Sequence, residues 1–311
     1  MQKKLIIVGV IIFVVGLGSG IVATQFLQKG FFFWRQLDMG HQVRQNSGYS
    51  YINPLLECEV AEGAIDAHKE NFQDDLESFV ETLKKDQKLT DTAVYFRDLN
   101  NGPTFGVNEK EEFFPASLLK VPVMMVYYHA SEQDPNILET EILYEKPKDF
   151  GFTPTIVPRE ELVPGQSYQV EELIRRMIIH SDNQALFLLS SRLPLESIGG
   201  LFSILGVGED VLTNPDAKLT VKEYAGFFRT LFNSSYLSRE NSEKALALLA
   251  MTDYQDALVA GVPADTKVSH KFGEAGTADV ERQLHDCGIV YLPNHPYLAC
   301  IMTRGKNPGT L

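Results

Sequence analysis

Ser117 and Lys120 are a residue pair whose spacing could activate a nucleophile. They stand three positions apart, at the start of an apolar segment that predicts a helix. Residues i and i+3 lie on one face of a helix, so the Lys120 amine can approach the Ser117 hydroxyl and take its proton. A chain of this composition contains about one such pattern by chance, and Ser117 could equally be a helix N-cap. The surrounding sequence must distinguish an activated nucleophile from a simple helix cap.

Two further motifs follow in an order that would bring polar groups to Ser117. Residues 181–183 are Ser-Asp-Asn and directly follow a predicted helix, offering a hydroxyl and an amide at its end. The same tripeptide is also typical of a turn. Residues 271–273 are Lys-Phe-Gly at the end of a predicted strand, and Glu274 comes next. Together the three motifs predict one site.

The order of predicted elements provides an architecture for that site. Apolar spacing predicts an amphipathic helix over residues 61–86, and β-rich segments predict strands at 92–98 and 104–107. Helical patterns then fill the middle of the chain, including a capping box over residues 220–223. Strand patterns return at residues 266–272, 284–292 and 297–303. We therefore expect an α+β fold, with a five-stranded antiparallel sheet, flanking helices and an inserted all-helical lobe.

The N-terminal residues predict a single membrane-spanning helix. Residues 5–26 contain no charged side chain and are long enough to cross a bilayer. A cleavable signal peptide would have a shorter apolar region and a small-residue cleavage site, and neither is evident. We expect residues 1–28 to be a retained anchor and residues 29–58 a juxtamembrane linker. The domain then spans 59–311, with a sheet lobe at 59–115 and 262–311 and a helical lobe at 116–261.

Charge and residue spacing argue against nucleic acid and metal ions as partners. The net charge of -13 and the absence of a basic run argue against nucleic acid. The histidines at positions 180, 270 and 285 and the dispersed cysteines lack the spacing of metal ligands, so we expect no metal and no cofactor. Packing is the favoured role for His270 and His285.

The cysteines predict free thiols in the last hairpin. A turn across residues 293–296 would place Cys287 opposite Met302, leaving Cys287 and Cys300 as diagonal neighbours too far apart for easy bonding. A bond to Cys58 stays open if the domain is exported.

The three motifs and their order make residues 55–311 resemble the class A β-lactamase and penicillin-binding-protein superfamily of active-site serine enzymes. The resemblance implies that Ser117 is the nucleophile that becomes acylated and that Lys120 is its proton acceptor or relay. Ser181 would pass a proton to the leaving nitrogen.

The same resemblance implies a set of substrate-binding groups. Asn183 would hold the substrate amide, and Lys271 would direct positive charge toward the substrate carboxylate and Ser181. Gly273 belongs to the same strand motif. The backbone N–H groups of Ser117 and Glu274 would form an oxyanion hole, which stabilises a tetrahedral intermediate.

The chain departs from the family in the loop that supplies a water-activating glutamate. Residues 205–216 contain no E-x-x-x-N pattern, although they include the carboxylates Glu209, Asp210 and Asp216. Without such a base, acylation by a β-lactam could proceed while turnover stalls.

Two other departures concern the substrate and the sheet. Phe272 replaces a hydroxyl residue that would help bind a carboxylate, and Thr277 is a candidate substitute. The chain ends at Leu311, directly after the last strand, where the family usually adds a helix. We therefore expect either a truncated chain or an uncovered sheet face.

The leading functional hypothesis is a bacterial, membrane-anchored serine hydrolase whose catalytic domain lies outside the cytoplasm. It would be acylated at Ser117 by β-lactams or related amides. One alternative is a D-Ala-D-Ala carboxypeptidase or transpeptidase acting on cell-wall peptides, which the missing loop glutamate favours. Another is a non-catalytic wall-binding module on the same scaffold, which the intact polar motifs argue against.

Overall fold

The structure, a computed structural model, describes residues 42–44, 48–58, 67–100, 104–151, 156–193, 198–208, 211, 214, 216–276 and 281–306. The predicted anchor at residues 5–26 lies outside these ranges. Within them, no helix is both long and apolar enough to cross a membrane.

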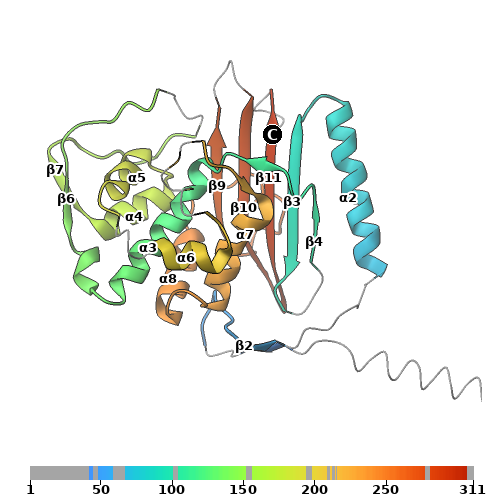
Figure 1. Ribbon diagram of the computed structural model, residues 1–311, viewed down its shortest axis with the longest axis horizontal. Helices are drawn as coiled ribbons and strands as arrows, with labels where there is room; N and C mark the ends of the chain where they lie inside the picture. The colour runs from blue at the N-terminus through green and yellow to red at the C-terminus, as the bar shows by residue number, and fades with distance from the viewer. Residues whose placement is uncertain are drawn as a thin grey trace, which may run out of the picture. The chain divides into compact units, whose positions relative to one another are not determined.

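A five-stranded antiparallel sheet forms the centre of the fold (Figure 1). Its spatial order is β4 (Thr104–Val107), β3 (Asp91–Asp98), β11 (His295–Gly305), β10 (Arg282–Leu292) and β9 (Val268–Ala275). Strands from the two ends of the domain meet where β3 pairs with β11. The prediction of five antiparallel strands, two before and three after the inserted lobe, is confirmed.

The last hairpin has a different register from the prediction. Its turn contains only residues 293–294, and Asn294 takes the left-handed φ of 63° that tight turns require. This turn sets Cys287 opposite Cys300 instead of Met302, and a disulfide joins the two cysteines. The prediction of free thiols is therefore wrong, because it assumed a turn two residues longer.

Helices flank the sheet on two sides, with α2 beside the β4 edge and the inserted lobe toward β9 (Figure 1). Helix α2 (Ala67–Lys85) packs beside β4, where the rings of Phe72 and Phe105 lie 5.5 Å apart. The other helices in the described part of the chain lie in the lobe inserted between β4 and β9. They are η1 (Ala116–Leu119), α3 (Lys120–Ser131), η2 (Pro135–Leu138), α4 (Val170–Ile179), α5 (Asn183–Ser190), α6 (Ile198–Leu205), α7 (Val221–Asn233) and α8 (Arg239–Leu249).

The inserted lobe is not wholly helical, which corrects the prediction. Strand β6 (Glu141–Tyr144) pairs with β7 (Gln166–Gln169), and β8 (Leu219–Thr220) pairs with β5 (Glu112–Phe113). Strands of two to four residues are too short for an alternating pattern to stand out in a sequence. Outside the main sheet, β1 (Gln42–Arg44) and β2 (Leu55–Cys58) form a further pair.

Helix α3 is the buried centre of the lobe. Every residue from 120 to 128 is buried, because this helix is apolar on all sides apart from its first residue. Helix α7 packs across β3, β10 and β11 and begins with the predicted capping box, in which Thr220 and Glu223 exchange hydrogen bonds. The first residue of α3, Lys120, is therefore enclosed by the core.

Residues 48–54, which the sequence analysis assigned to the linker, pack on the lobe. The Glu243 carboxylate accepts hydrogen bonds from the backbone N–H groups of Ser50, Tyr51 and Ile52, at 2.7, 2.9 and 3.0 Å. The Ile52 side chain is buried.

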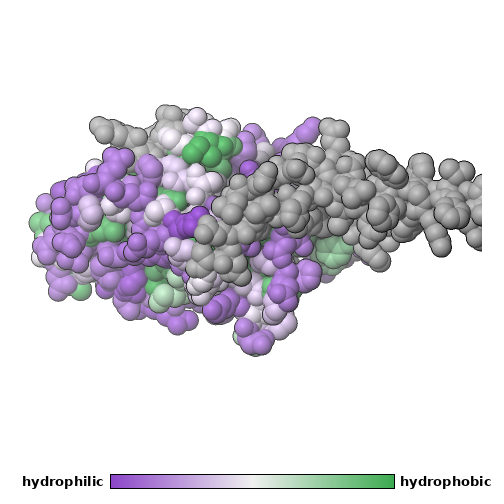
Figure 2. All heavy atoms as spheres, turned by 90° about the horizontal axis from the view of Figure 1, so that it is seen from below, coloured by the Kyte–Doolittle hydropathy of each residue, from purple (hydrophilic) through white to green (hydrophobic). Residues whose placement is uncertain are grey.

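The described surface seen in Figure 2 is largely hydrophilic, with its apolar side chains in separate patches.

Loss of the Cys287–Cys300 disulfide should destabilise the fold. Closing a loop of this length stabilises a protein by about 3 kcal/mol, largely by restricting the unfolded chain. Urea unfolding with and without a reductant should therefore show a lower midpoint for the reduced protein. The Cys287→Ala/Cys300→Ala variant should have a low midpoint that the reductant does not change. Equal midpoints for the wild-type protein under both conditions would contradict the assignment.

Candidate active site

Ser117 lies in a tight turn between the sheet and the inserted lobe. Ala116 has a left-handed φ of 50°, which is uncommon for a residue with a side chain. The N–H of Leu118 donates to the carbonyl of Pro115 at 2.9 Å. The Tyr224 hydroxyl, on α7, donates to the Leu118 carbonyl at 2.9 Å. These contacts hold the backbone around Ser117 in one conformation.

Lys120 brings together three of the residues singled out in the sequence. Its Nζ lies 2.8 Å from Ser117 Oγ, 2.9 Å from Ser181 Oγ and 2.7 Å from Asn183 Oδ1. A fourth contact, of 2.7 Å, joins it to the Ser181 carbonyl oxygen. An ammonium has three protons and cannot donate to all four oxygens. In the neutral form, the amine can instead accept the proton of Ser117.

Burial shifts the charge state of Lys120. Its side chain is fully enclosed, and this burial lowers the pKa of Lys120 to about 7, although the nearby Asp182 carboxylate acts in the opposite direction. A large share of the amine is therefore neutral at neutral pH. A base with a pKa close to the working pH is well suited to proton transfer.

Lys271 approaches the same hydroxyl from β9. Its Nζ donates to Ser181 Oγ at 3.0 Å and to the Phe272 carbonyl at 2.9 Å. Burial and the neighbouring Lys120 ammonium hold the pKa of Lys271 well below its usual range. Two ammonium groups on one hydroxyl would repel each other, so the site favours at most one charged lysine.

The Ser-Asp-Asn segment acts both as a turn and as part of the site. Ser181 has a left-handed φ of 52° and links α4 to α5. Asp182 caps α5, because its Oδ1 accepts from the N–H groups of Gln184 and Ala185, at 2.7 and 3.2 Å. This turn directs the side chains of Ser181 and Asn183 toward Lys120. The capping role of Asp182 was not predicted from the sequence, although an aspartate directly before a helix is a recognisable capping signal.

Strand β9 approaches the Ser117 turn closely at Gly273. A Cβ on this residue would lie 3.0 Å from Leu118 Cγ and 3.1 Å from the Pro115 carbonyl oxygen. A larger residue would therefore push β9 away from the turn. Glu274 is the next residue on β9. An oxyanion hole made by the N–H groups of Ser117 and Glu274 stays a prediction.

The Phe272 side chain occupies an apolar position on β9. It is buried, and its ring lies 4.5 Å from the ring of Tyr254. The Lys271 Nζ lies 3.9 Å from the centre of the same ring.

Thr277, the candidate substitute donor, is outside the described residues, as are Glu209 and Asp210. Asp216 is described and is exposed to solvent.

Each of the three histidines has a polar partner near the site. His270 Nδ1 lies 2.9 Å from a carboxylate oxygen of Asp286, and His180 Nδ1 lies 2.5 Å from one of Asp253. Burial lowers the pKa of His285 to about 4, so this ring is neutral. No group of side chains that could hold a metal ion is present in the part of the chain that the structure describes.

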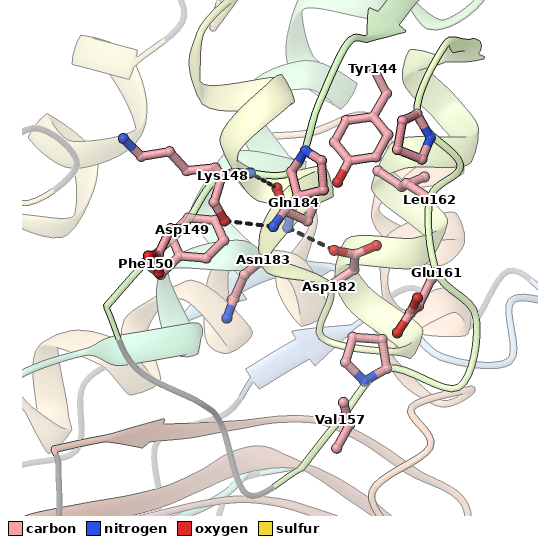
Figure 3. A pocket seen from close by; sticks show the side chains of 13 residues that line it. Tyr144, Lys148, Asp149, Phe150, Val157, Glu161, Leu162, Asp182, Asn183 and Gln184 are labelled. Carbon is pink, nitrogen blue, oxygen red and sulfur yellow. Dashed lines mark hydrogen bonds between the residues drawn. The ribbon is translucent and has the colours of Figure 1, made fainter.

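A cavity of 550 Å³ opens beside Asn183 (Figure 3). Asn183 thus belongs both to the Lys120 cluster and to the wall of this cavity. The sequence carries no motif for the cavity, because its opposite wall comes from an irregular segment before α4.

Comparisons with known proteins agree with the motifs. Residues 73–310 match the family model described as "Beta-lactamase enzyme family". A comparison with curated proteins finds no match.

Solved structures share the fold at low sequence identity. The fold is similar to that of a PBP-A mutant in an acyl-enzyme complex with penicillin G, at 20% identity over 78% of this chain and 90% of that chain, with a TM-score of 0.62. It is also similar to a class A β-lactamase from Mycobacterium abscessus, at 21% identity over 74% and 90% of the two chains, with a TM-score of 0.62. A β-lactamase from Xanthomonas campestris pv. campestris matches at 22% identity over 75% and 89%, with a TM-score of 0.62.

The reactivity of Ser117 should rise with pH through about 7. Lys120 is protonated below its pKa and neutral above it, and only the neutral amine can accept the serine proton. The rate of labelling by a sulfonyl fluoride, followed by mass spectrometry from about pH 5 to about pH 9, should reach a plateau above neutrality. Lys120→Arg keeps the charge at every pH and should lower the rate roughly 100-fold or more. A flat profile, or a reactive Lys120→Arg variant, would exclude Lys120 as the base.

Proposed function

Because this chain belongs to the β-lactamase enzyme family of serine hydrolases, we propose that it opens β-lactams or related amides by forming an acyl-enzyme on Ser117. The observation that carries the proposal is the 2.8 Å contact between Lys120 Nζ and Ser117 Oγ, in a site where burial lowers the pKa of Lys120 to about 7. An amine in this state can remove the serine proton at the moment of attack.

Acylation uses the groups of the cluster in turn. Lys120 takes the proton as Ser117 Oγ attacks the amide carbon, and the C=O π electrons move onto the carbonyl oxygen. The backbone N–H groups of Ser117 and Glu274 stabilise this oxygen. When the C–N bond breaks, the Ser181 hydroxyl gives its proton to the leaving nitrogen.

The proton relay then returns to its starting state through Lys120. Ser181 Oγ lies 2.9 Å from Lys120 Nζ, so the Lys120 ammonium, which carries the proton taken from Ser117, can reprotonate it. Lys271 Nζ, 3.0 Å from the same oxygen, holds the Ser181 hydroxyl in place for this transfer. The Asn183 amide oxygen accepts from Lys120, which leaves its NH₂ group to bind the substrate carbonyl.

Slow removal of the acyl group is part of the proposal. Residues 205–216 contain no E-x-x-x-N pattern, and among the described residues no carboxylate is hydrogen-bonded to Ser117 or Lys120. This observation favours a second candidate function, a D-Ala-D-Ala carboxypeptidase or transpeptidase acting on cell-wall peptides, which shares the same acylation step.

A non-catalytic wall-binding module would gain nothing from two buried lysines with lowered pKa values.

We further propose that the domain is exported and is held at the bacterial cell membrane by residues 5–26. The Cys287–Cys300 disulfide supports export, because disulfides persist in oxidising compartments and are rare in the cytosol.

Labelled penicillin tests the proposed acylation. Incubation with the purified full-length chain should add one penicillin mass, and the adduct should persist for minutes or longer. Ser117→Ala should form no adduct, whereas Ser190→Ala, which removes an exposed serine on α5, should label like the wild-type protein. An adduct lost within seconds would support a fast β-lactamase instead. An adduct on Ser117→Ala would rule out Ser117 as the nucleophile.

The proposed topology predicts that protease added to intact cells digests the catalytic domain. Residues 5–26 would hold the chain in the membrane with its C-terminal part outside. Loss of the domain should be visible on an immunoblot, with a cytoplasmic protein as the uncut control. A domain protected in intact cells and cut only after lysis would overturn this topology.

A further inference from the structure

His180 is a buried histidine that the acylation mechanism described above does not use. It caps the C-terminal end of α4 and directly precedes Ser181, whose backbone takes a left-handed φ of 52°. A residue with a side chain keeps such a conformation only where its neighbours hold it. The contacts of the His180 ring therefore bear on the position of the Ser181 side chain.

The two ring nitrogens of His180 have different partners. Nδ1 lies 2.5 Å from a carboxylate oxygen of Asp253, and Nε2 lies 3.4 Å from Nη1 of Arg175. A guanidinium can only donate, so Nε2 accepts from Arg175, and Nδ1 carries the ring proton and donates to Asp253. The Glu160 carboxylate lies 3.8 Å from Nε2, beyond hydrogen-bonding distance, and instead accepts from Arg175 at 3.0 Å.

Two glutamates hold the Arg175 guanidinium against the ring. Its Nε donates to Glu172 at 2.7 Å, and its Nη2 donates to Glu172 and to Glu160, each at 3.0 Å. Glu172 also accepts from Arg176 at 2.6 Å, which fixes its carboxylate on α4. Because these bonds use Nε and Nη2, they leave Nη1 of Arg175 to donate to His180.

Asp253 binds the end of α4 twice. Its side chain accepts from His180, and its backbone N–H donates to the carbonyl of Ile179 at 3.0 Å. Arg159 balances the carboxylate charge, because its Nη1 lies 3.5 Å from Asp253 Oδ1. Together these contacts attach the end of α4 to the segment that links α8 to β9.

The residues on either side of Asp253 contact β9. The Thr252 hydroxyl lies 3.1 Å from the carbonyl oxygen of His270. The Tyr254 ring lies 4.5 Å from the ring of Phe272. These two β9 residues flank the second lysine of the site.

The His180–Asp253 bond therefore closes a circuit of contacts around the Ser181 hydroxyl. On one side, Lys271 Nζ on β9 donates to Ser181 Oγ at 3.0 Å. On the other side, Ser181 is joined through His180 and Asp253 to the segment that packs on β9. A general acid must lie within hydrogen-bond reach of the atom that it protonates, so a small displacement of this hydroxyl slows the transfer.

We propose that His180 is a positioning residue, which acts through Asp253 to hold the Ser181 hydroxyl where it can protonate the leaving nitrogen. As the C–N bond breaks, its electron pair goes to the nitrogen, which takes the Ser181 proton. Lys120 then replaces that proton. The inference rests on the proposed acylation of Ser117.

Two reagents that differ in their leaving groups test this role. Opening of a penicillin requires a proton on the leaving nitrogen, whereas a sulfonyl fluoride that reacts with Ser117 releases fluoride as an anion. His180→Ala should lower the second-order rate of acylation by penicillin about tenfold or more, and should change the rate of sulfonylation by less than about twofold. Both rates can be followed by intact mass.

Substitution of Asp253 tests the same bond from its other end. The Asp253 side chain is 25% exposed, so its removal disturbs the core less than loss of the buried ring. Asp253→Ala should cause the same selective slowing, and the double variant should be no slower than either single variant, because both changes break one bond. His180→Asn places an N–H near the position of Nδ1–H and should react with penicillin faster than His180→Ala.

His295→Ala is the matched control. His295 is exposed at the start of β11 and is a histidine without a part in the circuit. The variant should react with both reagents at the wild-type rates.

The outcomes separate the positioning role from the acylation itself. Variants of His180 and Asp253 that slow both reagents equally, or neither, would overturn the inference and leave acylation of Ser117 intact. Slowing that multiplies in the double variant would also overturn it, since the two residues would then act independently. If penicillin does not acylate Ser117 of the wild-type protein, the proposed function fails, and the inference fails with it.

Discussion

The site depends on the enclosure of the Lys120 amine in the protein core. A buried ammonium is costly unless oxygen atoms replace its hydration shell, and Lys120 has four such atoms within 2.9 Å. These oxygens come from the Ser117 turn and from the Ser-Asp-Asn turn. Because one amine must satisfy both turns, its position fixes the distance between them. The same burial lowers the pKa of Lys120. Enclosure of this amine therefore both joins the two turns and makes the amine a base for Ser117.

Each element around Lys120 can be understood from this requirement. Helix α3 carries the lysine into the core, and Tyr224 on α7 holds the turn that precedes it. Strand β9 approaches through Gly273 and adds the second lysine. The disulfide joins β10 to β11, so β9 pairs with a strand that is itself cross-linked.

The sequence predicted the parts of the site that depend on local geometry. The i, i+3 spacing of Ser117 and Lys120 and the order of the three motifs were sufficient to name the residues that the structure brings together. The five-stranded sheet followed from strand patterns at the two ends of the domain. Register was not predictable in the same way, because one assumed turn length moved Cys287 by two positions relative to Cys300. The short strands β6 and β7 and the cavity beside Asn183 depend on tertiary contacts, for which the sequence carries no periodic signal.

The attachment of residues 48–54 has a consequence for how far the domain can stand from its N-terminal segment. The Glu243 carboxylate binds three successive N–H groups, so this part of the chain cannot extend while the contact holds. A fully extended chain spans about 3.5 Å per residue, so fixing seven residues removes roughly 25 Å of reach. If residues 5–26 lie in a membrane, the working distance of the catalytic site is set by the residues between that segment and residue 42, where β1 begins its pairing with β2. A single side chain on α8 therefore helps to determine how much of the N-terminal chain is free to act as a tether.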